Sequence, residues 1–423
     1  MSFPLLALTN ENLSLPTERA SHFFSHLPLW PDLVCIVLLL ATLLTFVNCV
    51  LSLAFFTALR PQAGDCCTRS HSEEKASAPQ KPPALSVLIP ARNEEHRIGK
   101  CLESLSAQTL KNFEILVLDD NSDDNTVGVV RESAKKDGRI RLVEGKKLPP
   151  RWVGKNWACH QLAQHARTGL LLFTDADTVH HPHALESVLD FADKNKADML
   201  SLWPRQITKT WSEWLVIPLI YVLILALRPQ WMERLRGLPA LGAANGQFIF
   251  FRREAYERIG GHKSVASHLV EDVALSRLAR LHRLRTLNAD GSQLVACRMY
   301  ENFFQVWEGF TKNLRAMFDD NVAAFVAFGV LVFAIYVLPF FLLPVLFGSG
   351  QAAAAMLCAA QCCLVWAQRA LLAARFLNPP QSVILHPIGQ LLVLVIACYS
   401  WLRLARGGVS WKGRLYGGSK RCG

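Results

Sequence analysis

Long apolar stretches stand near both ends of the chain and bracket a middle region of mixed character. The first covers residues 31–59, and three more follow at 322–347, 352–376 and 384–404. A membrane-spanning helix needs about 20 mostly apolar residues, so the pattern predicts one N-terminal and two to three C-terminal transmembrane helices. Residues 211–227 are also apolar, but Pro218 interrupts them, and we expect a segment at the membrane interface.

The middle region alternates short apolar runs with amphipathic stretches. Runs at 85–89, 113–118, 139–143 and 170–173 predict strands, and helices are expected from residue 98, after residue 126 and over 155–168. Strands and helices that alternate in this way are typical of an α/β domain with a mostly parallel sheet. The expected parts are an N-terminal segment 1–30, a transmembrane anchor 31–59, a linker 60–84, an α/β domain 85–320, a transmembrane region 321–404 and a basic tail 405–423.

The composition agrees with a membrane protein. Of the 423 residues, 51% are hydrophobic, the mean hydropathy is +0.21 and the net charge is +11. This charge indicates membrane lipids with anionic headgroups or phosphorylated substrates. No zinc finger or basic tract interleaved with aromatic residues points to nucleic acid. The twelve scattered cysteines predict neither a zinc site nor a disulfide framework.

Basic residues after the membrane regions predict the orientation. Those between 60 and 75 follow the first span and place the α/β domain in the cytoplasm, with the protein in the inner (plasma) membrane. The tail after residue 404 is also basic, yet three full C-terminal crossings would leave it outside. We therefore expect one stretch not to cross, and the polar Gln361 and Arg369 point to 352–376.

Two carboxylates, Asp175 and Asp177, follow the apolar run that ends at residue 173. Open α/β sheets bind ligands at the carboxyl ends of their strands, and oxygen ligands suit Mg²⁺ or Mn²⁺ together with substrate phosphates. A solvated acidic turn is the alternative. Polar residues at 92–94 and 119–120 follow the first two strands, which points to a nucleotide at this edge. No G-x-G-x-x-G motif follows the first strand, so a dinucleotide site is not expected.

Five short motifs occur in one order along the α/β domain. They are I-P-x-x-N-E-E at 89–95, L-D-D-x-S-x-D-x-T at 118–126, G-K at 154–155, T-D-A-D at 174–177 and E-D at 271–272. This series resembles the family 2 glycosyltransferases of GT-A fold. The motif W-K-G-R-L-Y at 411–416 and the flanking spans are similar to a membrane-bound subgroup that includes carotenoid- and hopanoid-associated enzymes.

The resemblance implies a role for each motif. The nucleotide-sugar would contact Pro90, Arg92, Glu94, Asp119, Asp120, Lys155 and Asp175, and the metal would bind Asp177 and Asp175. Asp272 would be the catalytic base, and Asn245, Gly246, Glu271 and Trp307 would lie on the acceptor side. The alternatives are helix capping for the acids at 119–124 and 271–272, a tight turn for Gly246 and packing at the membrane interface for Trp307.

The resemblance also implies a reaction. It would be an inverting transfer of a sugar, with glucose as the first expectation, from a UDP-sugar to a hydroxyl of a lipid-soluble acceptor such as a hydroxylated carotenoid. A polyprenyl-phosphate sugar synthase is the alternative. A processive polysaccharide synthase is disfavoured, because the Q-x-x-R-W motif of those enzymes is missing and residues 305–310 read Q-V-W-E-G-F. A membrane protein that binds nucleotide-sugar without turnover is the alternative from another class, and the oligomeric state stays open.

Overall fold

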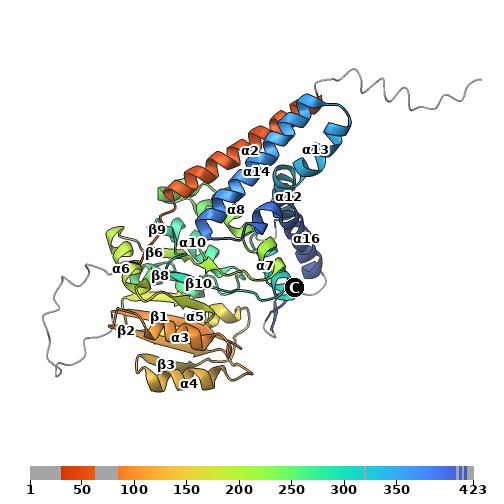
Figure 1. The fold of residues 1–423 in the computed structure, drawn as a ribbon. Coiled ribbons are helices and arrows are strands. Elements are labelled where there is room, and N and C mark those ends of the chain that lie inside the picture. The colour runs from red at the N-terminus through yellow and green to blue at the C-terminus, as the bar shows by residue number, and fades with distance from the viewer. Residues whose placement is uncertain (1–29, 62–83, 319–320, 406–408, 412–413, 417–423) are drawn as a thin grey trace, which may run out of the picture.

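The computed structural model describes residues 30–61, 84–318, 321–405, 409–411 and 414–416. The expected N-terminal segment, most of the linker and most of the basic tail lie outside the described residues. Figure 1 shows an α/β domain from which the long helices α2 and α14 project side by side.

A seven-stranded sheet organises the α/β domain, in the order β3-β2-β1-β4-β8-β6-β9. Neighbouring strands pair in parallel except at β8, which is antiparallel to both β4 and β6. The expected mostly parallel sheet is thus confirmed. The strands are β1 (Leu85–Ala91), β2 (Phe113–Asp119), β3 (Ile140–Glu144), β4 (Leu170–Thr174), β6 (Met199–Trp203), β8 (Phe248–Arg252) and β9 (Thr286–Asp290). The helices that flank it are α3 (Ile98–Ser106), α4 (Thr126–Lys136), α5 (Gly154–His165), α6 (Ala184–Lys194), α9 (Arg253–Arg258) and α10 (Glu271–Leu281).

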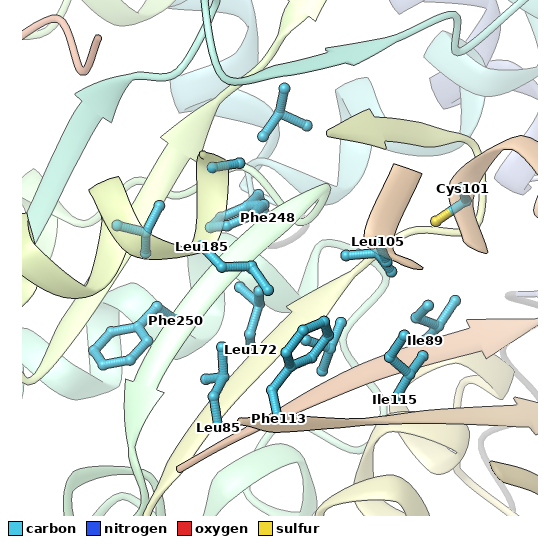
Figure 2. Close-up of a cluster of buried hydrophobic side chains, with 14 of the residues drawn as sticks. Leu85, Ile89, Cys101, Leu105, Phe113, Ile115, Leu172, Leu185, Phe248 and Phe250 are labelled. Carbon is cyan, nitrogen blue, oxygen red and sulfur yellow. The ribbon is translucent and has the colours of Figure 1, made fainter. Parts of the chain in front are cut away.

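Alternating side chains of the strands fill two hydrophobic cores, one on each face of the sheet. Figure 2 shows the core in which Leu85 and Ile89 of β1 pack with Leu105 of α3. The neighbouring Leu88 of β1 belongs to the opposite core, together with Leu162 of α5. Strands that are covered on both faces are apolar at nearly every position, which is why the sequence shows them as continuous apolar runs.

A second sheet and several short helices lie beside the main sheet. The second sheet has the order β5-β10-β7, formed by β5 (Thr178–His180), β10 (Val295–Cys297) and β7 (Arg205–Gln206). The short helices are α7 (Trp211–Val216), α8 (Leu219–Leu225), η2 (Gln230–Arg234), η3 (Pro239–Leu241) and η4 (Gly261–Lys263). The apolar stretch 211–227 therefore forms two short helices that separate at Pro218. Helix α8 packs against α2 and α14, so this stretch lies between the sheet and the long helices.

The helix bundle contains the expected N-terminal and C-terminal apolar stretches. Its helices are α2 (Trp30–Phe55), α12 (Val322–Tyr336), α13 (Leu338–Gly348), α14 (Ala352–Phe376), α15 (Gln381–Ile384) and α16 (His386–Ala405), and α11 (Phe303–Ala316) joins it to the α/β domain. By length and composition, α2 and α14 could each cross a membrane, and α12 with α13 could form a third span although the pair is bent by 48°. A hairpin of β11 (Val409–Trp411) and β12 (Arg414–Tyr416) follows.

The stretch 352–376, which we expected not to cross the membrane, is long and apolar enough to do so. Residues 352–376 form one unbroken helix, whereas the bend falls between α12 and α13, beside Pro339. The polar side chains of α14 explain the difference because they face the protein. Gln361 donates to Thr42 of α2 at 2.9 Å, and Arg369 is buried. Polar side chains inside membrane helices commonly face the bundle interior, so their presence does not mark a segment that fails to cross.

The bundle is joined to the sheet at the edge strand β9. After α2, the N–H of Leu59 donates to the carbonyl of Asp290 at 2.9 Å. The N–H of Asp290 in turn donates to the carbonyl of Thr57 at 2.9 Å. Arg375, in the last turn of α14, forms an ion pair with the buried carboxylate of Asp290 at 2.7 Å and donates to the carbonyl of Phe56. Helices α2 and α14 therefore end at the same point of the sheet.

Candidate active site

The candidate site lies where the strand order of the sheet reverses. The chain runs outward from β1 to β2 and β3 and then returns to β4 on the other side of β1. In open α/β sheets, ligands bind outside the carboxyl ends of the strands at such a switch point. The loops after β1, β2 and β4 carry the polar groups at 92–94, 119–120 and 175–177, so the fold brings them to one edge.

The loops after β1 and β2 are tied to each other by hydrogen bonds. Arg92 donates from Nη1 to the carbonyl oxygens of Asp120 and Asn121, at 2.6 Å each. The N–H of Glu94 donates to Oγ1 of Thr126 at 2.8 Å. Arg92 was expected in the nucleotide pocket, and the structure gives it a further task, because its guanidinium holds the second loop in place.

The other residues expected to hold the nucleotide lie beside these loops. Pro90 is paired with Leu118 across the β1–β2 ladder, next to Asp119. The carboxylate of Asp119 accepts the N–H of Ser122 at 3.3 Å within the loop, whereas α4 begins only at Thr126, so this bond is not a helix cap. Asp120 is 4% exposed, so most of its surface is covered by the protein.

Lys155 stands at the centre of the site, in the first turn of α5. Its ammonium group lies 2.8 Å from Oδ1 of Asp175 and 3.0 Å from Oε1 of Glu271. One cation thus joins the carboxylate after β4 to the carboxylate at the start of α10. Burial alone would lower the pKa of Lys155, but the two carboxylates hold it well above its usual value, so the amine stays charged.

Asp272 lies next to this ion-pair cluster and is held by backbone donors. Its Oδ2 accepts the N–H of Gly246 at 2.7 Å, and its Oδ1 accepts the N–H of Val273 at 2.8 Å. A Cβ at position 246 would lie 3.1 Å from Nζ of Lys155, 3.2 Å from Oδ2 of Asp272 and 3.3 Å from Oε1 of Glu271. A larger residue at 246 would therefore push these three charged groups a few tenths of an ångström from their present positions.

The two adjacent acids at the start of α10 have pKa values that are pushed apart. Burial and the neighbouring Glu271 raise the pKa of Asp272 to about 7. Burial would also raise the pKa of Glu271, but Lys155 and Lys312 outweigh it, and the pKa is lowered. Two carboxyl groups in such different environments can take different roles. Asp272 can exchange a proton near neutral pH, whereas Glu271 stays ionised.

Asp177, the second acid after β4, lies among buried groups. Burial and the charges of Asp177 and Asp175 raise the pKa of the Cys297 thiol, so this cysteine is neutral. Its sulfur accepts from Nε2 of Gln247 at 3.0 Å. Cys297 and Gln247 therefore lie beside the carboxylates. Gln247 belongs to the stretch 245–248 that was expected near the acceptor, whereas Cys297 was not expected from the sequence.

The carboxylates after β4 fit a hard divalent cation by their chemistry. Mg²⁺ and Mn²⁺ prefer oxygen ligands, and a Mg²⁺ site usually has one or two carboxylates together with substrate phosphates. Asp175 and Asp177 offer such oxygens, two positions apart. No group of three or more His, Cys, Asp or Glu side chains suited to a metal ion occurs within the described part of the chain. The phosphates of a donor would therefore complete the coordination shell.

Two residues expected on the acceptor side make other contacts. Asn245 is 8% exposed, and its Oδ1 accepts the N–H of Gln247 at 2.9 Å. Trp307 of α11 packs against Tyr399 of α16, with ring centroids 5.2 Å apart. Asn245 thus shapes the turn that presents Gly246, and Trp307 joins α11 to the helix bundle.

Two cations beside the site were not expected from the sequence. Lys312 of α11 is half-buried, and desolvation lowers its pKa even though the charge of Glu271 opposes this effect. Arg97, just before α3, forms an ion pair with Glu301 at 3.2 Å and lies within the electrostatic influence of Asp177. Single basic residues on amphipathic helices usually face solvent, so the sequence contains no signal that marks them.

Comparison with known proteins shows which family the chain resembles. Residues 86–260 match glycosyl transferase family 2. The chain is 31% identical to the 4,4'-diaponeurosporenoate glycosyltransferase of Staphylococcus aureus over 356 residues, which is 80% of this chain and 89% of that protein. It is 30% identical to the protein of the same name from Staphylococcus haemolyticus over 234 residues, 55% of this chain and 61% of that protein.

A solved structure agrees with the fold. A mannosyltransferase from Pyrobaculum calidifontis, in complex with GDP-Man and Mn²⁺, superimposes with a TM-score of 0.51 at 16% identity and covers 88% of this chain and 99% of its own. The sheet with acids at its switch point and this likeness show the GT-A fold, and the family match and the Staphylococcus aureus relative show a glycosyltransferase. The chain belongs to glycosyl transferase family 2. The expected family, fold and enzyme class are thereby confirmed, and the roles of single residues stay predictions.

Proposed function

We propose that this enzyme transfers a sugar from a UDP-sugar to a carotenoid-type acceptor dissolved in the membrane, with inversion at the anomeric carbon. Glucose is the first candidate for the sugar. The acceptor class is supported by the names of the two staphylococcal relatives. It also suits a chain in which two helices are long and apolar enough to cross a membrane.

The observation that carries the proposal is the contact between Asp272 and Gly246 beside the Lys155–Asp175 ion pair. An inverting transfer needs one base for the acceptor proton and positive charge near the leaving diphosphate. The cluster offers both. A base is most effective when its pKa lies near the working pH, and the pKa of Asp272 is about 7.

In the proposed reaction, an acceptor hydroxyl attacks the anomeric carbon from the face opposite the diphosphate. The new C–O bond forms while the bond to the diphosphate oxygen breaks, the hydroxyl proton passes to the carboxylate of Asp272, and UDP leaves with the bonding electron pair. Lys155 places positive charge beside the leaving group. A divalent cation, Mg²⁺ or Mn²⁺, held by Asp177 and Asp175 would offset the charge that develops on the diphosphate.

We assign the nucleotide to the loops after β1 and β2. Asp119 or Asp120 would accept N–H groups of the base, which is the ordinary hydrogen-bonding capacity of an ionised carboxylate. Pro90 and Glu94 would line the pocket, and Arg92 would keep the loop of Asp120 in place.

The proposed location is the inner (plasma) membrane, in several passes and with the α/β domain in the cytoplasm. Helices α2 and α14 end together at β9, so the path would run inward through α2, outward through α12 and α13, and inward again through α14. Helix α16 packs on α11 and α7 of the α/β side and also on α12, and we assign it to the cytoplasmic side. The basic tail would then stay in the cytoplasm without a further crossing, in agreement with the positive-inside rule.

A second acceptor is favoured by a specific observation. The relatives are named for 4,4'-diaponeurosporenoate, and the suffix "-oate" denotes a carboxylate, so we also propose a carboxylate as the reacting group of the acceptor. An ionised carboxylate has no proton to lose, so Asp272 would then position the acceptor rather than act as a base. The high pKa of Asp272 favours a hydroxyl acceptor, and the relatives favour a carboxylate.

The test is sugar transfer in membranes that contain wild-type enzyme or Asp272→Asn. Labelled UDP-glucose and either Mg²⁺ or Mn²⁺ would be supplied with a hydroxylated carotenoid, a carotenoid acid or a polyprenyl phosphate. Label in either carotenoid with wild type supports the proposal. Label only in the polyprenyl phosphate would replace the carotenoid by that acceptor. Binding of UDP-glucose without any transfer would support a non-catalytic binding protein instead.

A further inference from the structure

A cavity of about 180 Å³ opens at the foot of α2, away from the candidate active site. It lies at the edge strand β9, and strands β8 and β6 separate this edge from β4. Its lining includes Phe55 of α2, Trp231 and Arg236 of the segment that follows α8, Arg280 of α10 and Arg285 just before β9.

The segment that forms one wall of the cavity is fastened to the last turns of α2. Asn48 donates to the carbonyl of Ala226 at 2.8 Å and accepts from Nε1 of Trp231 at 2.9 Å. The N–H of Gln230 donates to Oγ of Ser52 at 3.2 Å. These turns belong to a helix of 26 residues, and about 20 residues suffice to cross the hydrocarbon layer. When α2 spans the membrane, its last turns and the cavity beside them would therefore lie at the height of the lipid headgroups.

Aromatic side chains mark the same height. Phe55 is 51% exposed and Trp231 is 40% exposed, and both border the cavity. Leu235, four residues after Trp231, is 48% exposed and also lines the cavity. Aromatic residues with an apolar ring face and a wet edge are typical of the boundary between lipid and water. This wall is therefore suited to lipid rather than to a small soluble ion.

The lining of the cavity includes two arginines, Arg236 and Arg285. Neither the guanidinium of Arg236 nor that of Arg285 forms a hydrogen bond or ion pair with any residue that the structure describes. Two other charged residues of the lining, Arg280 and Glu233, form hydrogen bonds within the protein. Arg280 donates to Oγ1 of Thr286 at 3.0 Å, and Glu233 accepts from Gln230 at 2.6 Å.

We propose that this cavity binds the phosphate group of an anionic phospholipid of the cytoplasmic leaflet, with Arg236 and Arg285 on the phosphate and Phe55 and Trp231 beside the glycerol and the first acyl carbons. Basic pockets beside transmembrane helices on the cytoplasmic side are known to receive lipid headgroups. A free phosphate ion offers the same charge but leaves the aromatic wall uncovered. The lipid would hold the foot of α2 at the membrane surface. This site is separate from glycosyl transfer and does not rest on the proposed reaction, but its place in the cytoplasmic leaflet rests on the proposed orientation of the protein.

The test is the retention of phosphatidylglycerol by the purified full-length protein. Wild type and the double variant Arg236→Gln/Arg285→Gln would be reconstituted in nanodiscs of phosphatidylcholine with phosphatidylglycerol, extracted into detergent, and their bound lipid counted by native mass spectrometry. The control is Arg131→Gln/Arg258→Gln, which removes the same charge at two exposed positions outside the cavity. No sugar donor is present, so the result is independent of catalysis.

We expect the cavity variant to bind phosphatidylglycerol about 30-fold more weakly than wild type, because each basic side chain near an anionic lipid surface contributes roughly a factor of five. The control should retain the lipid as wild type does. Equal loss in both double variants would mean that only the overall charge matters and would overturn the proposal. Displacement of the lipid by millimolar inorganic phosphate would overturn the lipid as the ligand and leave a simple phosphate site.

Discussion

Replacement of Asp272 by asparagine removes the proposed base with little change in shape. The carboxylate accepts two backbone N–H groups, those of Gly246 at 2.7 Å and Val273 at 2.8 Å. Asparagine keeps one acceptor oxygen, so one of these donors loses its partner, which costs about 1–3 kcal/mol when the group is buried. The variant also loses a carboxyl group that burial and Glu271 make costly to ionise. The two effects oppose each other, and the fold should persist.

The expected effect on turnover follows from the chemistry of the base. General acid–base catalysis contributes about 10²–10⁴-fold to the rate, which corresponds to roughly 2.7–5.5 kcal/mol in the activation free energy. With a hydroxyl acceptor, kcat of Asp272→Asn should fall by that factor while the Kd for UDP changes less than about threefold. In the wild type, kcat should fall as the pH falls through about 7, because the base is then protonated. The residual activity of the variant should lack this step.

Stability provides the control for folding. The pKa of Asp272 is raised above its unfolded value, so its contribution to stability is present below about pH 4 and is lost as the pH rises through about 7. Asp272→Asn does not titrate, and at pH 8 its Tm should equal or exceed that of the wild type. The assay combines initial rates at several pH values, UDP binding by calorimetry and thermal unfolding. A kcat within threefold of wild type for a hydroxyl acceptor, with UDP binding intact, would refute the role of Asp272 as base.

Three further predictions concern the cluster, its metal and its attachment to the helices. Gly246→Ala would place a Cβ 3.1 Å from the amine of Lys155 and should lower kcat at least tenfold with a loss of stability of only about 1–3 kcal/mol, measured by initial rates and urea unfolding. Asp177→Asn should raise the Mn²⁺ concentration needed for half-maximal transfer, and an unchanged metal titration would exclude Asp177 as a ligand. Arg375→Ala leaves the 3% exposed Asp290 without its ion pair and should cost up to about 3–5 kcal/mol, seen as a lower Tm. A second change, Asp290→Asn, should restore part of that loss.

Much of the sheet and its loops could be predicted from the sequence. Strands covered on both faces are apolar at nearly every position, so β1, β2 and β4 stand out as short apolar runs, and the polar loops after them follow in a recognisable order. The parallel arrangement then requires those loops to share one edge. This is why the residues around 92, 119 and 175 could be grouped before their distances were known.

The contacts within the site could not be predicted in the same way. Lys155 lies in the first turn of α5, just after a loop that contains several basic residues, and nothing near it in sequence shows that its partners are Asp175 and Glu271. Those partners depend on how α5 and α10 pack on one face of the sheet. Lys312 depends on a further step, the docking of α11. Local patterns indicate which segments form, whereas a charge's partner is decided by packing between segments that are distant in the sequence.

The polar residues of α14 illustrate the same limit for membrane helices. Polarity in an apolar stretch suggests contact with water, but Gln361 donates to Thr42 of α2, and Arg369 donates to Ser382 after the end of α14. Hydropathy reports how apolar a stretch is, but it does not show whether a polar side chain faces the protein or the lipid. The bend between α12 and α13 falls beside Pro339, one of the prolines in an otherwise apolar stretch. A proline is a common cause of a sharp bend in a helix, so it indicates the position of the bend.

Attachment on two sides gives the catalytic sheet a defined position relative to the long helices. On one side, Asp290 at the end of β9 binds Arg375 of α14 and the backbone that follows α2. On the other side, Gly389 of α16 approaches the carbonyl of Leu215 in α7 so closely that a Cβ would lie 2.4 Å from it, and α16 also packs on α11. A single attachment would let the sheet turn about the helices. An acceptor that stays in the bilayer can reach the active site only when that site is held at a fixed distance from the membrane surface. Two attachments between the sheet and the helices hold it there.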